Sequence, residues 1–461
     1  MRYFTLLCIF FASHLLYAET LTEKIDALIE HALPQAQVGI VIQDPQSGKI
    51  IYERNAQKLL SPASNIKILT AAAALYQLGP DYYYSTVLSQ KDNNLYITFS
   101  GNPALKTSDL KKLLQTLKTQ KITHIHGNIV LDTSQFSAPY HAAGVSYEDL
   151  GWYYAAPSTA VILNDNAVAY QFISAQTLGG TVQLKPSSAE NNLTIINELI
   201  TVNKEQAKEH CSLNIETKEN NSIRLYGCLA QSNKPITMRL AIPDPVFLAK
   251  QIIQTNIKEE NITLQGHIIE GKTPSDAQKI TVLHSDNLLR LITHMLQESD
   301  NLYADSVTKT LGFYLTGEGS YKQGVFAIKH ILSEHTHLNM QQLELSDGLG
   351  TRFNYVSPTQ LATLLQEIYQ NPKMYPLFFN ALPHMGLSGN LKDRLSKSVL
   401  NNKVIAKTGT MHDMSALSGY LYLANGKTLI FSIISNEVHG GIQKAKNLED
   451  KILLTLYQEN L

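Results

Sequence analysis

The sequence lacks an excess of charge of either sign. Its 38 lysines and arginines are balanced by 39 aspartates and glutamates, which leaves a formal net charge of −1 on 461 residues. Proteins that bind nucleic acid gather basic side chains to displace counterions from the phosphate backbone. We therefore expect no nucleic-acid partner. With 44% hydrophobic and 17% charged residues, the composition is that of a globular chain long enough for two or three domains.

Cysteine is scarce too, at three residues. If Cys8 is removed with the N-terminal segment described below, Cys211 and Cys228 remain as an even pair, and an even pair in an exported chain favours a disulfide. Two unpaired thiols are the alternative. Histidines do not show zinc-ligand spacing, because His335 and His337 lack the i, i+4 geometry of a helical ligand pair. We expect neither a metal ion nor a cofactor.

Long apolar runs are absent beyond the first residues. The start of the chain combines a charged segment, Met1–Tyr3, a short apolar run, Phe4–Leu16, and a small final residue, Ala18, as secretory signal peptides do. We expect cleavage near Ala18, removal of residues 1–18 and export to the periplasm; a buried N-terminal helix is the alternative. No second run reaches the roughly 18 apolar residues that a membrane span needs. At most peripheral membrane contact is expected.

Helical and strand patterns alternate at both ends of the chain. A capping box at Thr20–Glu23 opens an amphipathic helix that ends before Pro34, and Ser61 and Pro62 suit the N-cap and first position of an Ala- and Leu-rich helix. The other patterns predict strands at 38–42 and 49–52, helices at 288–296, 301–311 and 324–332, strands at 404–407, 417–423 and 428–434, and a last helix at 443–457.

The middle of the chain has a different pattern, with short strands and Asn- and Ser-rich turns and fewer helices. We therefore predict an α/β (α+β) fold. One domain, built from residues 19–85 and 283–461, is interrupted by a β-rich insertion at residues 86–282.

Ser64 and Lys67 are the first candidates for chemistry. Because they stand three positions apart in the first turn of a predicted helix, the lysine amine can reach the serine hydroxyl. A serine hydroxyl is a weak nucleophile at its own pKa and needs such a base, and the lysine must first lose its proton. The helix N-terminus also offers N–H groups to an oxyanion. Ser306–Lys309 repeats the spacing, but it lies mid-helix and is interpreted as a solvated helix face.

Two more motifs complete the candidate site. Ser299-Asp300-Asn301 lies at a break between two predicted helices, where a hydroxyl and a carboxamide can point into a cleft. Ser285-Asp286-Asn287 has the same residues, yet it follows no helix and is interpreted as a capping turn. Lys407-Thr408-Gly409-Thr410 ends a strand, where glycine permits close approach and the cation and hydroxyls suit a carboxylate. Alone, a Lys-Thr-Gly triplet is more often an ordinary strand-end turn.

The three motifs, in this order, resemble the Ser-x-x-Lys, Ser-x-Asn and Lys-Thr-Gly elements of the β-lactamase and penicillin-binding-protein superfamily. Over nearly all of its length after the predicted signal, the sequence is similar to the D-alanyl-D-alanine carboxypeptidase/endopeptidase family, the class C low-molecular-mass penicillin-binding proteins. Two positions depart from the family pattern: Asn102, where aspartate is usual, and Leu349, where Asp-Gly is usually followed by Ser-Gly. The matching stretches are 62–79, 101–105, 299–305, 347–350, 382–394 and 407–420.

The resemblance implies a β-lactamase/transpeptidase-like domain, with a five-stranded antiparallel sheet flanked by helices, and an insertion of two small domains. It implies a serine D-Ala-D-Ala carboxypeptidase or DD-endopeptidase that cleaves peptidoglycan stem peptides and cross-links through an acyl-enzyme. β-Lactam antibiotics would be covalent inhibitors. An oligomer is compatible with the sequence.

The same resemblance assigns the reacting groups. Ser64 would be the nucleophile and Lys67 its base, Ser299 would relay a proton to the leaving amine, and Asn301 would orient Lys67 and the substrate amide.

It also assigns the binding groups. The terminal carboxylate would be bound by Lys407, Thr408, Gly409 and Thr410. The N–H groups of Ser64 and Thr410 would form the oxyanion hole. Asp149 corresponds in position to a family carboxylate that meets the free amine of the diaminopimelate side chain; a solvated surface acid is the alternative.

Three other functions are weaker interpretations. A catalytically weak peptidoglycan-binding or scaffolding homologue fits poorly with intact motifs, and a β-lactamase does not need so long an insertion. A Ser-His-Asp hydrolase is disfavoured because the sequence has no Gly-x-Ser-x-Gly elbow.

Overall fold

The computed structural model describes residues 19–188, 193–209 and 211–459. The predicted signal peptide at residues 1–18 therefore lies outside the described residues. Within the described ranges, no helix is both long and apolar enough to cross a membrane.

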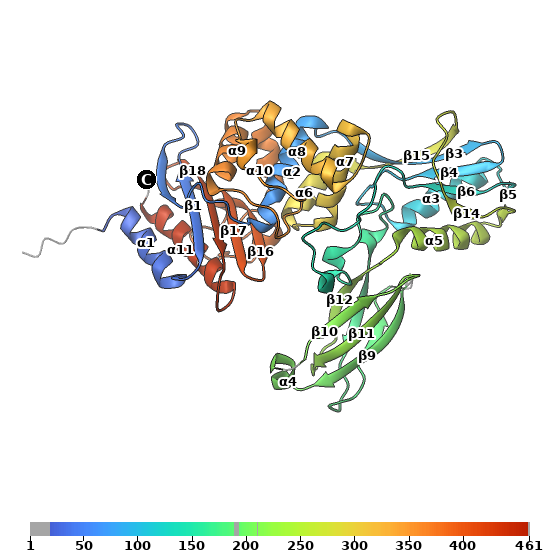
Figure 1. The fold of residues 1–461 in the computed structure, drawn as a ribbon, viewed down its shortest axis with the longest axis horizontal. Coiled ribbons are helices and arrows are strands. Elements are labelled where there is room, and N and C mark those ends of the chain that lie inside the picture. The colour runs from blue at the N-terminus through green and yellow to red at the C-terminus, as the bar shows by residue number, and fades with distance from the viewer. Residues whose placement is uncertain (1–18, 189–192, 210, 460–461) are drawn as a thin grey trace, which may run out of the picture.

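A five-stranded antiparallel sheet joins the two ends of the chain (Figure 1). Its strand order is β16-β17-β18-β1-β2, so that the N-terminal hairpin extends the C-terminal meander, with Gln37 opposite Asn436. The predicted antiparallel sheet flanked by helices is confirmed. The elements of this body are α1 (Leu21–Ala32), β1 (Gln37–Gln43), β2 (Ile50–Arg54), α2 (Ile66–Gln77), α6 (Leu288–Gln297), α7 (Asn301–Thr316), α8 (Tyr321–His335), α9 (Pro358–Gln370), α10 (Met374–Ala381), β16 (Val404–Met411), β17 (Met414–Tyr422), β18 (Thr428–Asn436) and α11 (Gln443–Glu459).

Helices cover both faces of this sheet. α1 and α11 pack against each other on one face, and α2 with α6 to α10 forms a thicker layer on the other (Figure 1). β17 and β18 are consequently buried at nearly every position. Their sequences accordingly show no polar side that alternates with an apolar one, and even their serines, Ser415, Ser418, Ser432 and Ser435, are buried.

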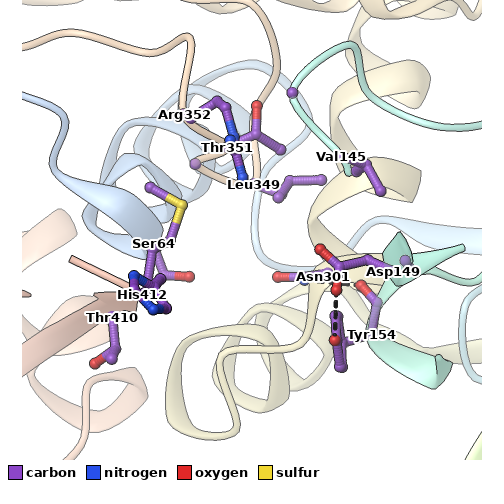
Figure 2. Close-up of a pocket in the computed structure, with 14 residues that line it drawn as sticks. Ser64, Val145, Asp149, Tyr154, Asn301, Leu349, Thr351, Arg352, Thr410 and His412 are labelled. Atoms are coloured by element: carbon purple, nitrogen blue, oxygen red, sulfur yellow. Dashed lines mark hydrogen bonds between the residues drawn. The ribbon is translucent and has the colours of Figure 1, made fainter. Parts of the chain in front are cut away.

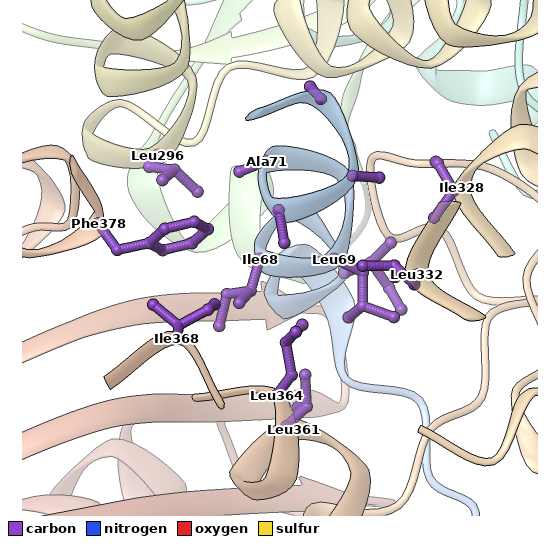
Figure 3. Close-up of a cluster of buried hydrophobic side chains, with 14 of the residues drawn as sticks. Ile68, Leu69, Ala71, Leu296, Ile328, Leu332, Leu361, Leu364, Ile368 and Phe378 are labelled. Atoms are coloured by element: carbon purple, nitrogen blue, oxygen red, sulfur yellow. The ribbon is translucent and has the colours of Figure 1, made fainter. Parts of the chain in front are cut away.

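Helix α2 runs through the centre of the helical layer. Ten consecutive residues, Ile66 to Leu75, are buried, and all of them except Lys67 and Thr70 are apolar. Figure 3 shows Ile68 and Leu69 among side chains of the surrounding helices, such as Leu332 and Leu364. The core thereby fixes the first turn of α2, which carries Lys67.

The middle of the chain, which the sequence predicts to be an insertion, contains a second five-stranded sheet, of order β14-β6-β4-β3-β15, and two three-stranded sheets, β12-β7-β8 and β10-β11-β9. β3 enters the insertion and β15 leaves it, and the two strands pair. The elements are β3 (Tyr83–Lys91), β4 (Asn94–Thr98), α3 (Thr107–Thr119), β5 (His124–Ile125), β6 (Ile129–Asp132), β7 (Ala167–Ile173), β8 (Gln183–Pro186), β9 (Thr194–Val202), α4 (Lys204–Glu209), β10 (Leu213–Thr217), β11 (Ser222–Ala230), β12 (Ile236–Ala241), α5 (Pro245–Glu259), β13 (Thr263–Leu264), β14 (Ile268–Glu270) and β15 (Gln278–Asn287).

Two sequence expectations about the insertion and its flank are confirmed. Cys211 and Cys228 form a disulfide, with their Cα atoms 5.7 Å apart. Asn287, the last residue of the second Ser-Asp-Asn triplet, caps α6 by accepting a hydrogen bond from the N–H of Arg290.

The interpretation of Ser306–Lys309 as a solvated helix face is wrong. Both side chains are fully buried in the middle of α7. The ammonium of Lys309 donates hydrogen bonds to the carbonyl oxygens of Ser137, Pro139 and Ser158, which belong to the insertion. The lysine faces another part of the chain rather than water, which a helical pattern alone does not reveal.

Candidate active site

The helix that carries Lys67 begins later in the chain than the sequence predicts. Residues 63–65 form a 3-10 turn and α2 begins at Ile66, so the predicted N-cap at Ser61 is wrong. A contact with β18 holds Ser61 instead: the Asn436 side chain accepts its N–H and donates to its carbonyl, both at 2.8 Å. Ala63 has a φ of 47°, a left-handed conformation that is rare for a residue with a side chain and is concentrated at functional sites.

Lys67 is the centre of the hydrogen-bond network. Its ammonium lies 2.9 Å from Ser64 Oγ, 2.9 Å from Asn301 Oδ1 and 2.8 Å from the carbonyl oxygen of Leu349. The side chain is fully buried. Burial lowers the pKa of Lys67 to about 8, although the nearby carboxylates act in the opposite direction. A buried amine with this pKa, in contact with a serine hydroxyl, is suited to act as a general base.

The loop at Asp347–Gly350 supplies the third acceptor for Lys67. The buried carboxylate of Asp347 accepts hydrogen bonds from the N–H groups of Leu349, Gly350 and Thr351 at 3.1, 2.8 and 3.3 Å. This turn directs the Leu349 carbonyl at Lys67. Gly350 adopts a φ of 97°, and a Cβ there would lie 2.0 Å from the carbonyl oxygen of Ala63. Sequence reasoning identified this loop as a family match but did not foresee its contact with Lys67.

Ser299 and Asn301 lie at the break between α6 and α7, as predicted. Ser299 has a φ of 57°, which turns the chain between the two helices. Its hydroxyl accepts a hydrogen bond of 2.8 Å from the ammonium of Lys407. Asn301 contacts Lys67 with its oxygen and donates its Nδ2 to the carbonyl of Tyr154 at 2.8 Å. The amide therefore links the base to the insertion.

Lys407 is a second fully buried amine. Besides Ser299, its ammonium contacts the carbonyl oxygen of Thr408 at 2.8 Å. Burial, followed by the charge of Lys67, holds the pKa of Lys407 well below its usual value. An anion placed beside Lys407 would favour its charged form.

Strand β16 presents backbone donors to the site because it is an edge strand of the sheet. Val404 and Ala406 direct their backbone groups to the outer edge, since the Val404 carbonyl accepts from Met385 and the Ala406 N–H donates to Pro383. Backbone direction alternates along a strand, so the N–H of Thr410 points to the same edge. Gly409 makes the close approach possible, because a Cβ there would lie 2.5 Å from the carbonyl of Pro62.

These elements surround a cavity of about 350 Å³, which we call the Ser64 cavity (Figure 2). Ser64 and Thr410 line one side of it, and Asn301 and Asp149 line the other. The Tyr154 hydroxyl donates a 2.8 Å hydrogen bond to the Asp149 carboxylate. The remaining lining residues, which sequence reasoning did not single out, include Val145, Thr351, Arg352, Met411 and His412.

The structure thus brings all the predicted site residues to one place. Ser64, Asn301, Thr410 and Asp149 line the cavity itself. Lys67 contacts Ser64, and Lys407 contacts Ser299 and the carbonyl of Thr408. Thr408 and Gly409 lie in β16, the strand that also carries Thr410. Among the described residues, no group of three or more His, Cys, Asp or Glu side chains is placed to hold a metal ion.

Comparison with known proteins gives consistent matches over almost the whole chain. A family model described as the D-Ala-D-Ala carboxypeptidase 3 (S13) family matches residues 21–458. D-alanyl-D-alanine carboxypeptidase DacB of Haemophilus influenzae is 28% identical over 442 residues, which cover 93% of this chain and 91% of the relative. D-alanyl-D-alanine carboxypeptidase of Actinomadura sp. is 27% identical over 441 residues, which cover 90% of this chain and 81% of the relative.

Solved structures give the same result. The crystal structure of penicillin binding protein 4 (dacB) from Haemophilus influenzae superposes with a TM-score of 0.87 at 27% identity, covering 94% of this chain and 99% of the other. A structure of that protein complexed with a β-lactam superposes with a TM-score of 0.81 at 25% identity, covering 94% and 98%.

Proposed function

Because the chain belongs to the D-Ala-D-Ala carboxypeptidase 3 (S13) family, we propose how its site hydrolyses the D-alanyl peptide bond. The protein is a serine-type D-Ala-D-Ala carboxypeptidase or DD-endopeptidase that acts on peptidoglycan peptides through an acyl-enzyme and is inhibited by β-lactams. The observation that carries the mechanism is the contact of the Lys67 amine with Ser64 Oγ at 2.9 Å.

Neutral Lys67 accepts the proton of Ser64 as the serine oxygen attacks the carbonyl carbon of the penultimate D-alanine. Asn301 and the Leu349 carbonyl hold the amine in place for this transfer. As the C–N bond breaks, Ser299 passes a proton to the leaving amine and is reprotonated by charged Lys67, which returns Lys67 to its neutral form. Water then hydrolyses the serine ester, with Lys67 again acting as the base.

Lys407 couples substrate binding to this step. A substrate carboxylate bound at Lys407, Thr408 and Thr410 favours the charged form of Lys407. The charge of Lys67 lowers the pKa of Lys407, and because repulsion between two like charges acts on both partners, a charged Lys407 favours neutral Lys67. The substrate itself thereby prepares the base.

The oxyanion is stabilised by two backbone donors. The N–H of Ser64 lies at the turn that opens α2, and the N–H of Thr410 points outward from the edge of β16. Preorganised donors of this kind lower the barrier because they meet charge that develops only in the transition state.

Asp149 binds the free amine of the diaminopimelate side chain in the acyl half of the substrate. Two observations support this role: Asp149 lines the Ser64 cavity, and the Tyr154 hydroxyl fixes its carboxylate. An acid that was simply solvated would not need to lie in the cavity that holds the nucleophile.

The organisation and location of the protein follow from the same function. Residues 19–85 and 283–461 form the catalytic domain, and residues 86–282 form an insertion of two small domains that borders the cleft. The chain is exported to the periplasm after cleavage near Ala18, with at most peripheral membrane contact. An oligomer remains compatible with this assignment.

Labelling with a fluorescent penicillin tests the proposal. The purified protein should form a covalent adduct, and Ser64→Ala should abolish it. Ser306→Ala, in the second Ser-x-x-Lys motif, is the matched control and should retain the label. A wild-type protein without an adduct, or one that does not hydrolyse a D-Ala-D-Ala peptide, would favour the scaffolding alternative, and rapid nitrocefin turnover would favour a β-lactamase.

A further inference from the structure

A second cavity lies directly beside the Ser64 cavity. It has a volume of about 230 Å³, and Tyr154 and Asn301 line both cavities. Of the two serines assigned to the reaction, Ser64 lines only the first cavity and Ser299 lines only the second. We call the second one the Ser299 cavity.

The walls of the Ser299 cavity come from two parts of the chain. One wall is formed by the end of α6 and the start of α7, and the other is formed by the insertion. The lining residues are Tyr153, Tyr154, Asp165, Arg239, His294, Glu298, Ser299, Asp300, Asn301 and Leu302. The cavity exists only because the insertion is docked against this helix break.

Charged groups of both signs line this cavity. The Arg239 guanidinium contacts Asp165 at 2.7 Å and lies 4.8 Å from the centre of the Tyr153 ring. His294 lies 3.4 Å from Asp300, and this contact raises its pKa. The side chains of Arg239 and His294 keep 36% and 43% of their surface exposed, so a ligand can reach them. An arginine with five N–H donors, held on an aromatic ring, is suited to bind a carboxylate.

The reaction determines which half of the substrate lies on this side. Ser64 retains the acyl half as an ester, and Ser299 gives a proton to the amine that departs. The leaving half must therefore lie within reach of the Ser299 hydroxyl. When the leaving group is D-alanine, it ends at the carboxylate that is held near Lys407. The leaving strand of a cross-link continues as a peptide with further carboxylates and amides. This strand therefore needs additional polar space.

We propose that the Ser299 cavity is the subsite for the leaving peptide strand of a cross-link, with Arg239 and His294 binding its carboxylates. The inference rests on the proposed function and deepens it, because it assigns the leaving strand of a cross-link to a cavity and two side chains that the proposed function does not use. The chemical step is the one given above: the Ser64 ester forms, the D-alanyl C–N bond breaks, and the amine leaves with its strand and one proton.

The experiment compares two substrates, a monomeric muropeptide that ends in D-Ala-D-Ala and a D-alanyl cross-linked dimer, by chromatography of the products. The measured quantity is the ratio of kcat/KM for the dimer to kcat/KM for the monomer. Arg239→Ala and His294→Gln should each lower this ratio about tenfold, as the loss of one charge-assisted hydrogen bond at a partly exposed position does. The change should fall mainly on the KM for the dimer.

Arg290→Ala is the matched control. Like His294, Arg290 belongs to α6, but it is exposed and pairs with Asp286, so its removal should leave the ratio as it is. The rate of acylation by benzylpenicillin, measured on every variant, checks that the Ser64 cavity is intact. If Arg239→Ala loses acylation as well, the smaller changes Arg239→Gln and His294→Gln decide the question by the same ratio.

Two results would overturn the inference. One is a wild-type protein that cleaves the monomer but not the dimer, and the other is a ratio that stays constant in the Arg239 and His294 variants. Both differ from failure of the proposed function, in which wild-type protein would form no penicillin adduct and would cleave neither substrate.

Discussion

Two buried amines, Lys67 and Lys407, determine the chemistry at the scale of single residues. Two like charges close together in a buried site are unfavourable, so the pair favours states in which one amine is neutral. The contacts assign different tasks to the two: Lys67 touches the Ser64 hydroxyl, and Lys407 touches Ser299. The neutral amine is required beside the nucleophile, and the charged one is required where a carboxylate binds.

The pKa of Lys67 predicts how acylation depends on pH. Burial lowers this pKa to about 8, and only the neutral amine can accept the serine proton. The acylation rate should therefore rise as the pH increases through about 8 and then level off. Stopped-flow measurement with a fluorescent penicillin between roughly pH 6 and pH 9.5 checks the profile, with the range chosen to bracket that pKa.

Substitution of the same lysine gives the matching test. Lys67→Ala should slow acylation by about a thousandfold, the usual contribution of a general base. Lys58→Ala, at an exposed position, should have little effect. A Lys67→Ala variant that acylates at nearly the wild-type rate would show that another group removes the proton.

At the scale of helices and strands, local sequence patterns predict an element well where interactions between neighbouring residues determine it. The strand predicted at 404–407 was too short, because β16 continues to Met411 and Lys407 to Thr410 lie within it rather than at its end. The capping box at Thr20 and the strand predicted at 428–434, by contrast, were predicted nearly to their ends. The start of α2 was not, because Asn436 of β18, 375 positions away from Ser61, holds that backbone. Contacts between distant segments leave no periodic signal in the sequence.

The packing of β16 against the turn at Ala63 predicts the effect of a single methyl group. In Gly409→Ala the Cβ would lie 2.5 Å from the Pro62 carbonyl and 3.2 Å from the Ser64 nitrogen. The strand must then move away from the nucleophile, which displaces the oxyanion donors. Acylation by penicillin should fall about a hundredfold, since a misplacement of about 1 Å can cost that much.

Gly426→Ala provides the comparison for this substitution. Gly426 lies in the hairpin turn between β17 and β18, where an added Cβ meets no atom within 4 Å. Its positive φ makes alanine strained, so this variant should lose stability while it keeps its acylation rate. Equal acylation rates in the two variants would contradict the role given to the contact between β16 and Ala63.

At the scale of the whole molecule, the site depends on how the middle of the chain, the proposed insertion, is attached to the sheet and helices built from the two ends of the chain. Asn301 reaches the Tyr154 carbonyl, and Asp149 enters the Ser64 cavity, from the same insertion segment. The Ser-x-x-Lys, Ser-x-Asn and Lys-Thr-Gly motifs were sufficient to predict the nucleophile, its base and the other site residues, because each motif is a short run with its own local chemistry. They could not place Lys309, whose partners are carbonyl groups 151 to 172 positions away.

Lys309 attaches α7 to this insertion segment through three hydrogen bonds. Its ammonium binds the carbonyls of Ser137, Pro139 and Ser158 at 3.0, 2.9 and 3.1 Å, and it lies 4.7 Å from the centre of the Tyr321 ring. Lys309→Met fills similar space but leaves these buried oxygens without their donor. Each such loss costs about 1–3 kcal/mol, and we expect a total of about 3–5 kcal/mol.

Urea unfolding measures this loss, with Lys322→Met as the control because Lys322 is exposed on the neighbouring helix α8. The control should unfold at the wild-type midpoint. Lys309 does not line the Ser64 cavity, so the folded fraction of Lys309→Met should still acylate with penicillin. A variant with undiminished stability would mean that the three carbonyls find other donors, and the insertion would then be held to α7 mainly by its apolar contacts.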